Sequence, residues 1–218
     1  MFYSTIDFDF SVKTKKLLLD YFLVKFKINF PHAEAIEEEH PYKKFLWAKT
    51  AVGQELAVFL KKFNCNLDYH GINFFVSNTA DYYIGNPHID SIPDNQTNNS
   101  DAYLHASGSR IKSRFSVMVL GNSQDPMYWW DFMPFGDPRL VVNEFKYLNN
   151  ERYYSLNIPG SDTKERWDYL GQPTFVADKV WAPSAFIKTD CAHTVNCSPG
   201  PRLMVTVPLQ KSVEEIIS

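Results

Sequence analysis

The feature that most constrains the fold is a series of short runs rich in β-branched and aromatic residues between residues 72 and 209. The runs are INFFVSN, DYYIG, SRFSVMVLGN, MYWWDF, RLVVNEFKYL, RYYSLNI, PTFVAD, SAFIKT and RLMVTVPL. Clusters of Gly, Pro, Asn and Asp, which favour turns, separate them. Such a succession predicts a mainly β fold, an antiparallel sandwich or barrel, of which the jelly roll is one form.

Two helical segments precede these runs. Residues 12–28 carry apolar positions at helix-compatible spacing, and residues 50–64 form a second amphipathic pattern. The polar stretch 31–45 between them is expected to hold a loop and a short helix. We expect one domain over residues 1–218, with helical support over residues 1–66 and a jelly-roll core over residues 67–210.

Composition and charge narrow the classes of protein. The chain has 218 residues, of which 44% are hydrophobic and 16% aromatic, enough for a sizeable core. The formal net charge is −3 and no Lys/Arg-rich block occurs, so we expect neither nucleic acid nor a membrane surface as a partner. The N-terminus lacks a signal-peptide layout, and no apolar run approaches about 20 residues. The sequence therefore predicts a cytoplasmic protein and does not indicate its oligomeric state.

The cysteines are Cys65, Cys191 and Cys197. An odd number without a secretion signal indicates reduced thiols. Cys191 and Cys197 bracket His193, which raises the question of a zinc site. Zinc sites usually pair ligands at CxxC-like spacing, so five intervening residues give this hypothesis little support.

The first candidate site lies in YYIGNPHIDS, residues 82–91. Alternate residues of a strand share one face, so His88 and Asp90 would project together. An imidazole beside a carboxylate can be a surface accident, because such pairs arise often by chance. It can also supply two of the three ligands of a metal site. The pair therefore needs a second cluster before it indicates function.

The second cluster lies in residues 184–209. A strand reaching His193, the turn sequence NCSPGP and a strand starting at Arg202 predict an antiparallel hairpin with those two side chains close together. Arg202, Met204 and Thr206 would share one face of the second strand. An arginine on the inner face of a small barrel requires an anion, because burying an unpaired charge destabilises the fold by several kcal/mol.

Together these residues resemble a family signature. His88-x-Asp90, a distal His193, and Arg202 nine residues later are similar to the motif of the Fe(II)- and 2-oxoglutarate-dependent dioxygenases, closest to the prolyl-hydroxylase-like branch. The resemblance covers about residues 70–209 as a pattern of strands, with PHID and AHTVN…GPRLMVTV as its motifs. The fold of that family, a double-stranded β-helix or cupin-like jelly-roll barrel preceded by helices, agrees with the strand pattern.

The resemblance implies a ligand set and a reaction. His88, Asp90 and His193 would bind Fe(II) on one face and leave three coordination positions open. The co-substrate 2-oxoglutarate would take two of them and O2 the third, while Arg202 would bind the far carboxylate. The implied reaction is hydroxylation of a C–H bond of an amino acid, a peptidyl residue or a small metabolite, with release of succinate and CO2.

The chain departs from the family pattern beside the arginine. Many relatives have a Ser two residues after it, where this chain has Met204. A second hydroxyl for 2-oxoglutarate would then come from elsewhere, with Tyr82, Tyr83 and Ser116 as candidates, although barrel packing also accounts for each. The Gly-Gly pair common on the middle strand is replaced by PMYWWDFMP, residues 126–134. Its adjacent tryptophans would face opposite sides, one in the core and the other near a substrate mouth.

Two questions stay open from sequence. The Asn-, Ser- and Asp-rich stretch 91–110 can be a lid over the site or a solvated loop. The alternatives to a 2-oxoglutarate enzyme are a cupin-type metalloenzyme that does not use this co-substrate and a non-catalytic jelly-roll binding protein. Release of succinate by the iron-loaded protein would discriminate among them.

Overall fold

The computed structural model describes residues 1–26, 47–67, 72–85, 87–89, 111–130, 141–146, 152–157, 167–168, 170–181 and 183–218. Its helices are α1 (Val12–Phe26), α3 (Ala51–Lys61) and α6 (Val213–Ile217). Its strands up to the middle of the chain are β1 (Tyr3–Ile6), β2 (Asn73–Thr79), β3 (Tyr83–Ile84), β4 (His88–Ile89), β5 (Ser113–Leu120) and β6 (Met127–Trp130). The later strands are β7 (Val141–Lys146), β8 (Arg152–Asn157), β9 (Phe175–Ala177), β10 (Ser184–Lys188), β11 (Ala192–Cys197) and β12 (Gly200–Leu209).

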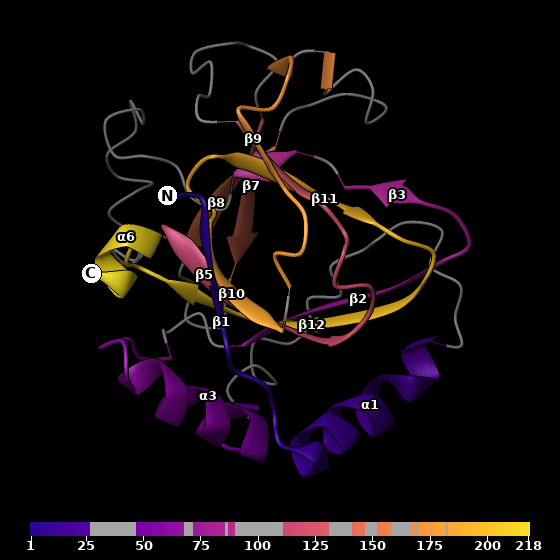
Figure 1. The fold of residues 1–218 in the computed structure, drawn as a ribbon, viewed down its shortest axis with the longest axis vertical. Helices are drawn as coiled ribbons and strands as arrows, with labels where there is room; N and C mark the ends of the chain where they lie inside the picture. Colours follow the sequence, from indigo (N-terminus) through magenta and orange to yellow (C-terminus); the bar gives the residue numbers. More distant parts are fainter. Residues whose placement is uncertain are drawn as a thin grey trace.

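The described strands form two antiparallel sheets. One sheet has the order β1-β10-β5-β12-β2, and we call it the Arg202 sheet. The other has the order β7-β8-β4-β11-β6-β9, with β3 also paired to β11, and we call it the His193 sheet. In Figure 1 the strands of the two sheets surround a common interior, with β12 and β2 on the side of the helices. The predicted mainly β fold with N-terminal helices is confirmed.

The chain alternates between the two sheets. After β2 it enters the His193 sheet through β3 and β4, returns for β5, and crosses again for β6 to β9. It then contributes β10 to the Arg202 sheet, β11 to the His193 sheet and β12 to the Arg202 sheet. Every described connection from β9 to β12 therefore changes sheet.

This alternation corrects the hairpin expected around residues 198–199. β11 pairs with β3, β4 and β6, whereas β12 pairs with β2 and β5, so the two strands are not partners. His193 also lies near the beginning of β11 and not near its end. The turn residues predict a reversal of the chain correctly, but a reversal can join two facing sheets as well as two neighbouring strands.

The helices α1 and α3 cover the outer face of the Arg202 sheet (Figure 1). Each buries its apolar side against every second residue of the strands, as the helical spacing predicts. This outer core includes Leu18 and Phe22 of α1, Leu56 and Leu60 of α3, Phe74 and Val76 of β2, Phe115 and Val117 of β5, and Leu203, Val205 and Val207 of β12.

The opposite residues of the same strands face the interior between the sheets. Met204 belongs to a separate buried cluster that contains Met118 of β5 together with Met127 and Trp129 of the His193 sheet. Because Arg202 and Thr206 alternate with the helix-facing residues, the shared inner face predicted for β12 is confirmed. The sheet therefore carries an apolar outer core and a mixed inner face.

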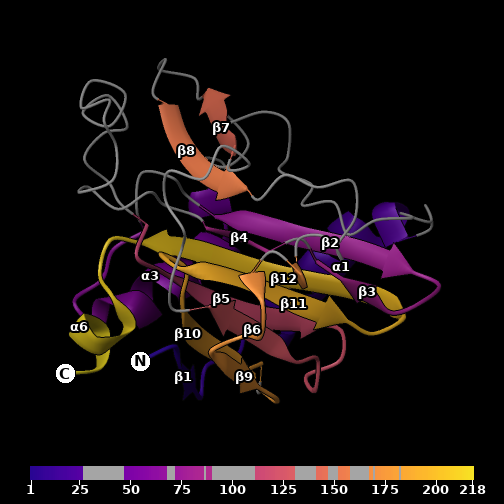
Figure 2. The ribbon, with the colours of Figure 1, turned by 90° about the horizontal axis from the view of Figure 1, so that it is seen from above.

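Two elements were not expected from sequence. Strand β1 pairs with β10 at one edge of the Arg202 sheet, and α6 begins with a capping box between Ser212 and Glu215. The N-terminal ammonium pairs with Glu214 of α6, so the two termini lie near each other (Figure 2). Within the described part of the chain, no helix combines the length and the apolar character that a membrane span requires.

Candidate metal centre

Two imidazoles meet in the interior between the sheets. His88 of β4 and His193 of β11 are direct cross-strand partners, and their ring centroids lie 4.5 Å apart with an angle of 53° between the ring planes. Cross-strand partners project to the same side of a sheet. His193 is also the partner of Trp129, which packs in the interior cluster, so the imidazoles share this inward side.

A backbone hydrogen bond fixes the orientation of the His193 ring. Its Nδ1 lies 2.9 Å from the carbonyl oxygen of Cys191. A carbonyl only accepts, so Nδ1 carries the hydrogen and Nε2 is the acceptor nitrogen of the neutral ring. This is the arrangement typical of an imidazole that binds a metal through Nε2. His193 is buried, whereas His88 is half-buried.

The separation of the two imidazole rings is compatible with adjacent positions of a six-coordinate ion. Nitrogen ligands at about 2.1 Å from the ion, at right angles, lie about 3 Å apart, which the facing rings allow. Asp90, the third expected ligand, lies outside the described residues and stays a prediction. Within the described ranges, no three His, Cys, Asp or Glu side chains gather into a metal site. Because this search included Cys191, His193 and Cys197, the zinc hypothesis gains no support.

Gly85, three residues before His88, is hydrogen-bonded to β11. Thr194 Oγ1 donates to the carbonyl oxygen of Gly85 at 2.6 Å, and the Gly85 amide donates to the carbonyl of Val195 at 3.0 Å. A Cβ atom on Gly85 would lie 2.8 Å from Thr194 Oγ1, so a side chain there would displace this contact. The Gly-Asn-Pro sequence indicated a break in the strand but not this attachment.

Arg202 carries a buried charge that no carboxylate of the described residues neutralises. It is 7% exposed, and its Cζ lies 5.7 Å from the centroid of the Trp181 ring. Its Nη1 lies 2.9 Å from Cys197 Sγ and its Nη2 2.8 Å from Met204 Sδ, while its Nε has no hydrogen-bond partner. Sulfur is a weak acceptor, so the guanidinium donors are poorly satisfied.

The sulfur atoms around Arg202 do not neutralise it. Burial raises the pKa of the Cys197 thiol above its ordinary value of 9.0, and the opposing effect of Arg202 is smaller. The thiol is therefore uncharged at neutral pH, as is the thioether of Met204. No ion pair joins Arg202 to a carboxylate among the residues that the structure describes. This site can accept an anion from outside the chain.

Close packing fixes the direction of Arg202. Gly121, just after β5, has a φ of +135°, and a Cβ atom there would lie 3.1 Å from Arg202 Cγ and 2.8 Å from Met118 Sδ. The pairing of β5 with β12 shifts register between Leu203 and Met204 beside it. Glycine thus lets the backbone approach the aliphatic stem of the arginine. Sequence reasoning did not single out Gly121, although glycine after a strand favours such a close approach.

The other predicted site residues occupy different places. Ser116 is buried on β5, in register with Thr206 and Ala185, and its Oγ has no hydrogen-bond partner. It lies four residues along β12 from the level of Arg202, whose register partner is Ser77. Tyr82 is 73% exposed. The roles of Ser116 and Tyr82 toward 2-oxoglutarate stay predictions.

The adjacent tryptophans face opposite sides of β6, as expected, and both are buried. Trp129 donates from Nε1 to the carbonyl of Lys188 and packs in the interior. Trp130 donates from Nε1 to the carbonyl of Gly171 and packs edge-on against Trp167 on the other side. Neither side chain is exposed, so the expectation of a tryptophan at a substrate mouth is not met. The expected lid, residues 91–110, lies outside the described residues.

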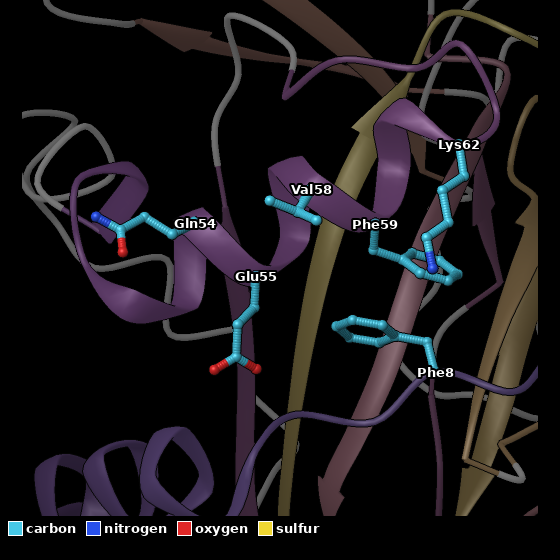
Figure 3. A pocket seen from close by; sticks show the side chains of 6 residues that line it. All are labelled: Phe8, Gln54, Glu55, Val58, Phe59 and Lys62. Atoms are coloured by element: carbon cyan, nitrogen blue, oxygen red, sulfur yellow. The ribbon is translucent and has the colours of Figure 1, made fainter.

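A groove on the outer side of α3 is separate from the metal centre. Its volume is about 360 Å³, and Figure 3 shows the rings of Phe8 and Phe59 close together, with the Lys62 side chain reaching over Phe59. The remaining lining residues are Gln54, Glu55 and Val58. This groove lies on the helix side of the Arg202 sheet, away from the interior that holds the imidazoles. It has no His pair and no buried cation.

In comparisons with known proteins, no family model matches the chain and no curated protein matches its sequence.

Proposed function

We propose that the protein is an Fe(II)- and 2-oxoglutarate-dependent oxygenase that hydroxylates a C–H bond and releases succinate and CO2. One observation carries the proposal: a buried arginine that no described carboxylate neutralises lies in the same interior as a pair of inward-facing imidazoles. A neutral imidazole pair offers ligands for a divalent metal, and a guanidinium offers a fork for a carboxylate. A keto acid that chelates a metal and carries a distant carboxylate uses both.

The order of the strands supports a double-stranded β-helix. With β1, β3, β7 and β8 set aside, successive strands from β2 to β12 alternate between the Arg202 and His193 sheets, except that β6 and β9 both belong to the His193 sheet. Wrapping two facing sheets in this way is how a jelly roll is built. The fold would place the ends of several strands around one interior, where ligands from β4 and β11 converge.

The distance along the strands suits a small dicarboxylate. Cys197, which contacts the guanidinium of Arg202, lies four residues beyond His193 on β11. Four residues of strand span about 13 Å. The metal ligands and the cationic end are thus far enough apart for 2-oxoglutarate to lie between them.

The chain's own residues would bind, orient and exclude water. When bound, Fe(II) supplies the activation of O2 for oxidation of both the keto acid and the substrate. His88 and His193 would hold the metal, with Asp90 as the expected third ligand. Arg202 would neutralise the distant carboxylate and fix its orientation, and the apolar residues around it, among them Trp181 and Met204, would keep water away.

The test is titration of 2-oxoglutarate into the Mn(II)-loaded protein by calorimetry without oxygen. Binding at millimolar concentration or below is expected, followed by succinate release when Fe(II) and O2 are supplied. Metal binding without 2-oxoglutarate binding would favour the cupin-type metalloenzyme. Absence of metal binding would favour the non-catalytic binding protein.

A further inference from the structure

A polar row crosses the inner face of the Arg202 sheet. Asn73 of β2 and Ser116 of β5 are the two register partners of Thr206 on β12, so the three side chains project side by side toward the interior. All three residues are buried, and neither Ser116 Oγ nor Asn73 Oδ1 has a hydrogen-bond partner. A buried polar atom left unsatisfied costs about 1–3 kcal/mol, so two of them in one row mark a place where a polar ligand would be stabilised.

A second buried guanidinium is directed at this row. Arg114 lies two residues before Ser116 on the same face of β5 and is 7% exposed. Its Nη1 lies 3.2 Å from Thr206 Oγ1, and its Cζ lies 5.9 Å from the centroid of the Phe75 ring. The row therefore combines a fixed positive charge, two hydroxyl groups and an amide.

The row lies opposite the imidazole pair. Arg202 contacts Cys197 across the interior, and residues 198–199 join β11 to β12. Moving away from that turn, four residues lead back from Cys197 to His193 on one sheet and forward from Arg202 to Thr206 on the other. The rise per residue is similar in the two strands, so Thr206 is at the level of His193. Facing sheets pack about 10 Å apart, so the row and the imidazole pair border the same interior.

We propose that Arg114, Ser116, Thr206 and Asn73 form the receptor for the primary substrate, and that this substrate is a free α-amino acid. The guanidinium and the Ser116 hydroxyl donate to its carboxylate, with Thr206 holding Arg114 in place. The amide oxygen of Asn73 accepts from its ammonium group. This inference rests on the proposed function, and it selects one of the three substrate classes that the sequence left open. Arg202 serves the co-substrate at the other end of β12.

The expected energetics are those of a charge-assisted contact. A hydrogen bond to a charged group contributes about 1.5–3 kcal/mol, which corresponds to about tenfold to a few hundredfold in affinity. An amino-acid amide keeps the size and the ammonium group but loses the negative charge. It is therefore expected to bind at least about tenfold more weakly than the matching amino acid.

The test is calorimetric titration of the protein loaded with Mn(II) and 2-oxoglutarate, without oxygen. The probes are the proteinogenic L-amino acids and their amides. At least one amino acid should bind, and its amide should bind at least about tenfold more weakly. Arg114→Gln and Ser116→Ala should each weaken amino-acid binding at least about tenfold, with the affinities for Mn(II) and 2-oxoglutarate unchanged. Ser113→Ala serves as the control. It removes another buried hydroxyl of β5, which donates a hydrogen bond to the Lys211 carbonyl.

The outcomes separate this inference from the proposed function. If 2-oxoglutarate binds but no free amino acid does, the receptor assignment is wrong and the proposed function stands. The receptor assignment is also wrong if Ser116→Ala weakens 2-oxoglutarate instead of the amino acid. If 2-oxoglutarate does not bind the wild type, the proposed function fails, and the same titrations on the Mn(II)-loaded protein decide the receptor alone. In those titrations, the receptor assignment is supported if an amino acid binds more tightly than its amide and if Ser116→Ala abolishes this preference.

Discussion

His88 and His193 are cross-strand partners on β4 and β11, with ring centroids 4.5 Å apart, although 104 residues separate them in sequence. The carbonyl of Cys191 accepts from Nδ1 of His193, so Nε2 is the nitrogen through which this ring would bind a metal. Two imidazoles side by side in a buried interior give little stability by themselves. The proposed metal ion would account for this pairing, and the first prediction tests it.

Replacing His193 should abolish high-affinity metal binding. Because His193 supplies one of the expected ligands, His193→Ala should lower the affinity for Mn(II) or Co(II) by more than about 100-fold, beyond the effect of a group behind a ligand. Metal titration followed by calorimetry measures this. His32→Ala, a histidine without partner spacing in the sequence, is the control and should bind like the wild type. An unchanged stoichiometry and affinity in His193→Ala would remove this residue from the site.

Replacing Arg202 should affect the co-substrate and not the metal. The bidentate pair with a carboxylate contributes about 1.5–3 kcal/mol, so Arg202→Ala should raise the 2-oxoglutarate concentration required at least about tenfold. Arg202→Lys should recover only part, because an ammonium keeps the charge but not the fork. Calorimetry on the Mn(II)-loaded variants gives both affinities. Equal losses of metal and 2-oxoglutarate binding would mean that the substitution disturbs the fold.

The sequence predicted those features that depend on local periodicity. Alternation along β12 placed Arg202 on the inner face, and helical spacing placed α1 and α3, because each pattern repeats within one element. The His88 and His193 pair was reached through resemblance to a family motif. Its direct cross-strand register could not be read from either motif alone.

The missed features depend on contacts between distant segments. The turn after Cys197 looks the same whether it joins neighbouring strands or facing sheets, so the hairpin prediction was wrong. In the sequence, Arg114 looks like an ordinary polar residue at the start of a strand. Only the pairing of β5 with β12 brings its guanidinium to Thr206. Strand β1 is four residues long and shows no clear alternation of polar and apolar residues. Only its pairing with β10 identifies it as a strand.

The carboxylate of Glu55 should make stability depend on pH. Burial acts to raise the pKa of Glu55, but hydrogen bonds from Thr14 and Ser11 outweigh it, and the pKa is lowered from 4.5. A lowered folded-state pKa gives stability that is present above the unfolded value and lost as pH falls through the folded value. Glu55→Gln should therefore lower the unfolding free energy at pH 7 by about 1 kcal/mol and reduce its loss below pH about 4.5.

Denaturant unfolding at several pH values checks the Glu55 prediction. Gln54→Glu, on the exposed neighbouring position of α3, adds a carboxylate without these partners and serves as a control. A wild-type protein and a Glu55→Gln variant with parallel stability curves from pH 7 to pH 3 would contradict it.

The hydroxyl of Thr194 should act on metal binding through the position of His88. Thr194→Val keeps the shape and removes the 2.6 Å hydrogen bond to the Gly85 carbonyl, three residues before His88. The metal affinity should fall by about 10–100-fold, the range for groups that position a ligand. Thr194→Ser restores a hydroxyl and should recover most of it. A purely structural role would instead lower the unfolding midpoint of the metal-free protein without changing metal affinity.

A methyl group at Gly121 should weaken 2-oxoglutarate binding through Arg202. In Gly121→Ala, the new Cβ would lie 3.1 Å from Arg202 Cγ and 2.8 Å from Met118 Sδ, so the arginine stem must move. The positive φ of +135° adds strain that any side chain would introduce there. Gly171→Ala separates the two effects, because Gly171 also has a positive φ, +72°, but nothing lies within 4 Å of its Cβ position. Both variants should lose stability, whereas only Gly121→Ala should lose at least about tenfold in 2-oxoglutarate affinity at unchanged Mn(II) affinity. Equal 2-oxoglutarate affinities in the two variants would show that the stem of Arg202 tolerates the added methyl group and that Gly121 does not position the guanidinium.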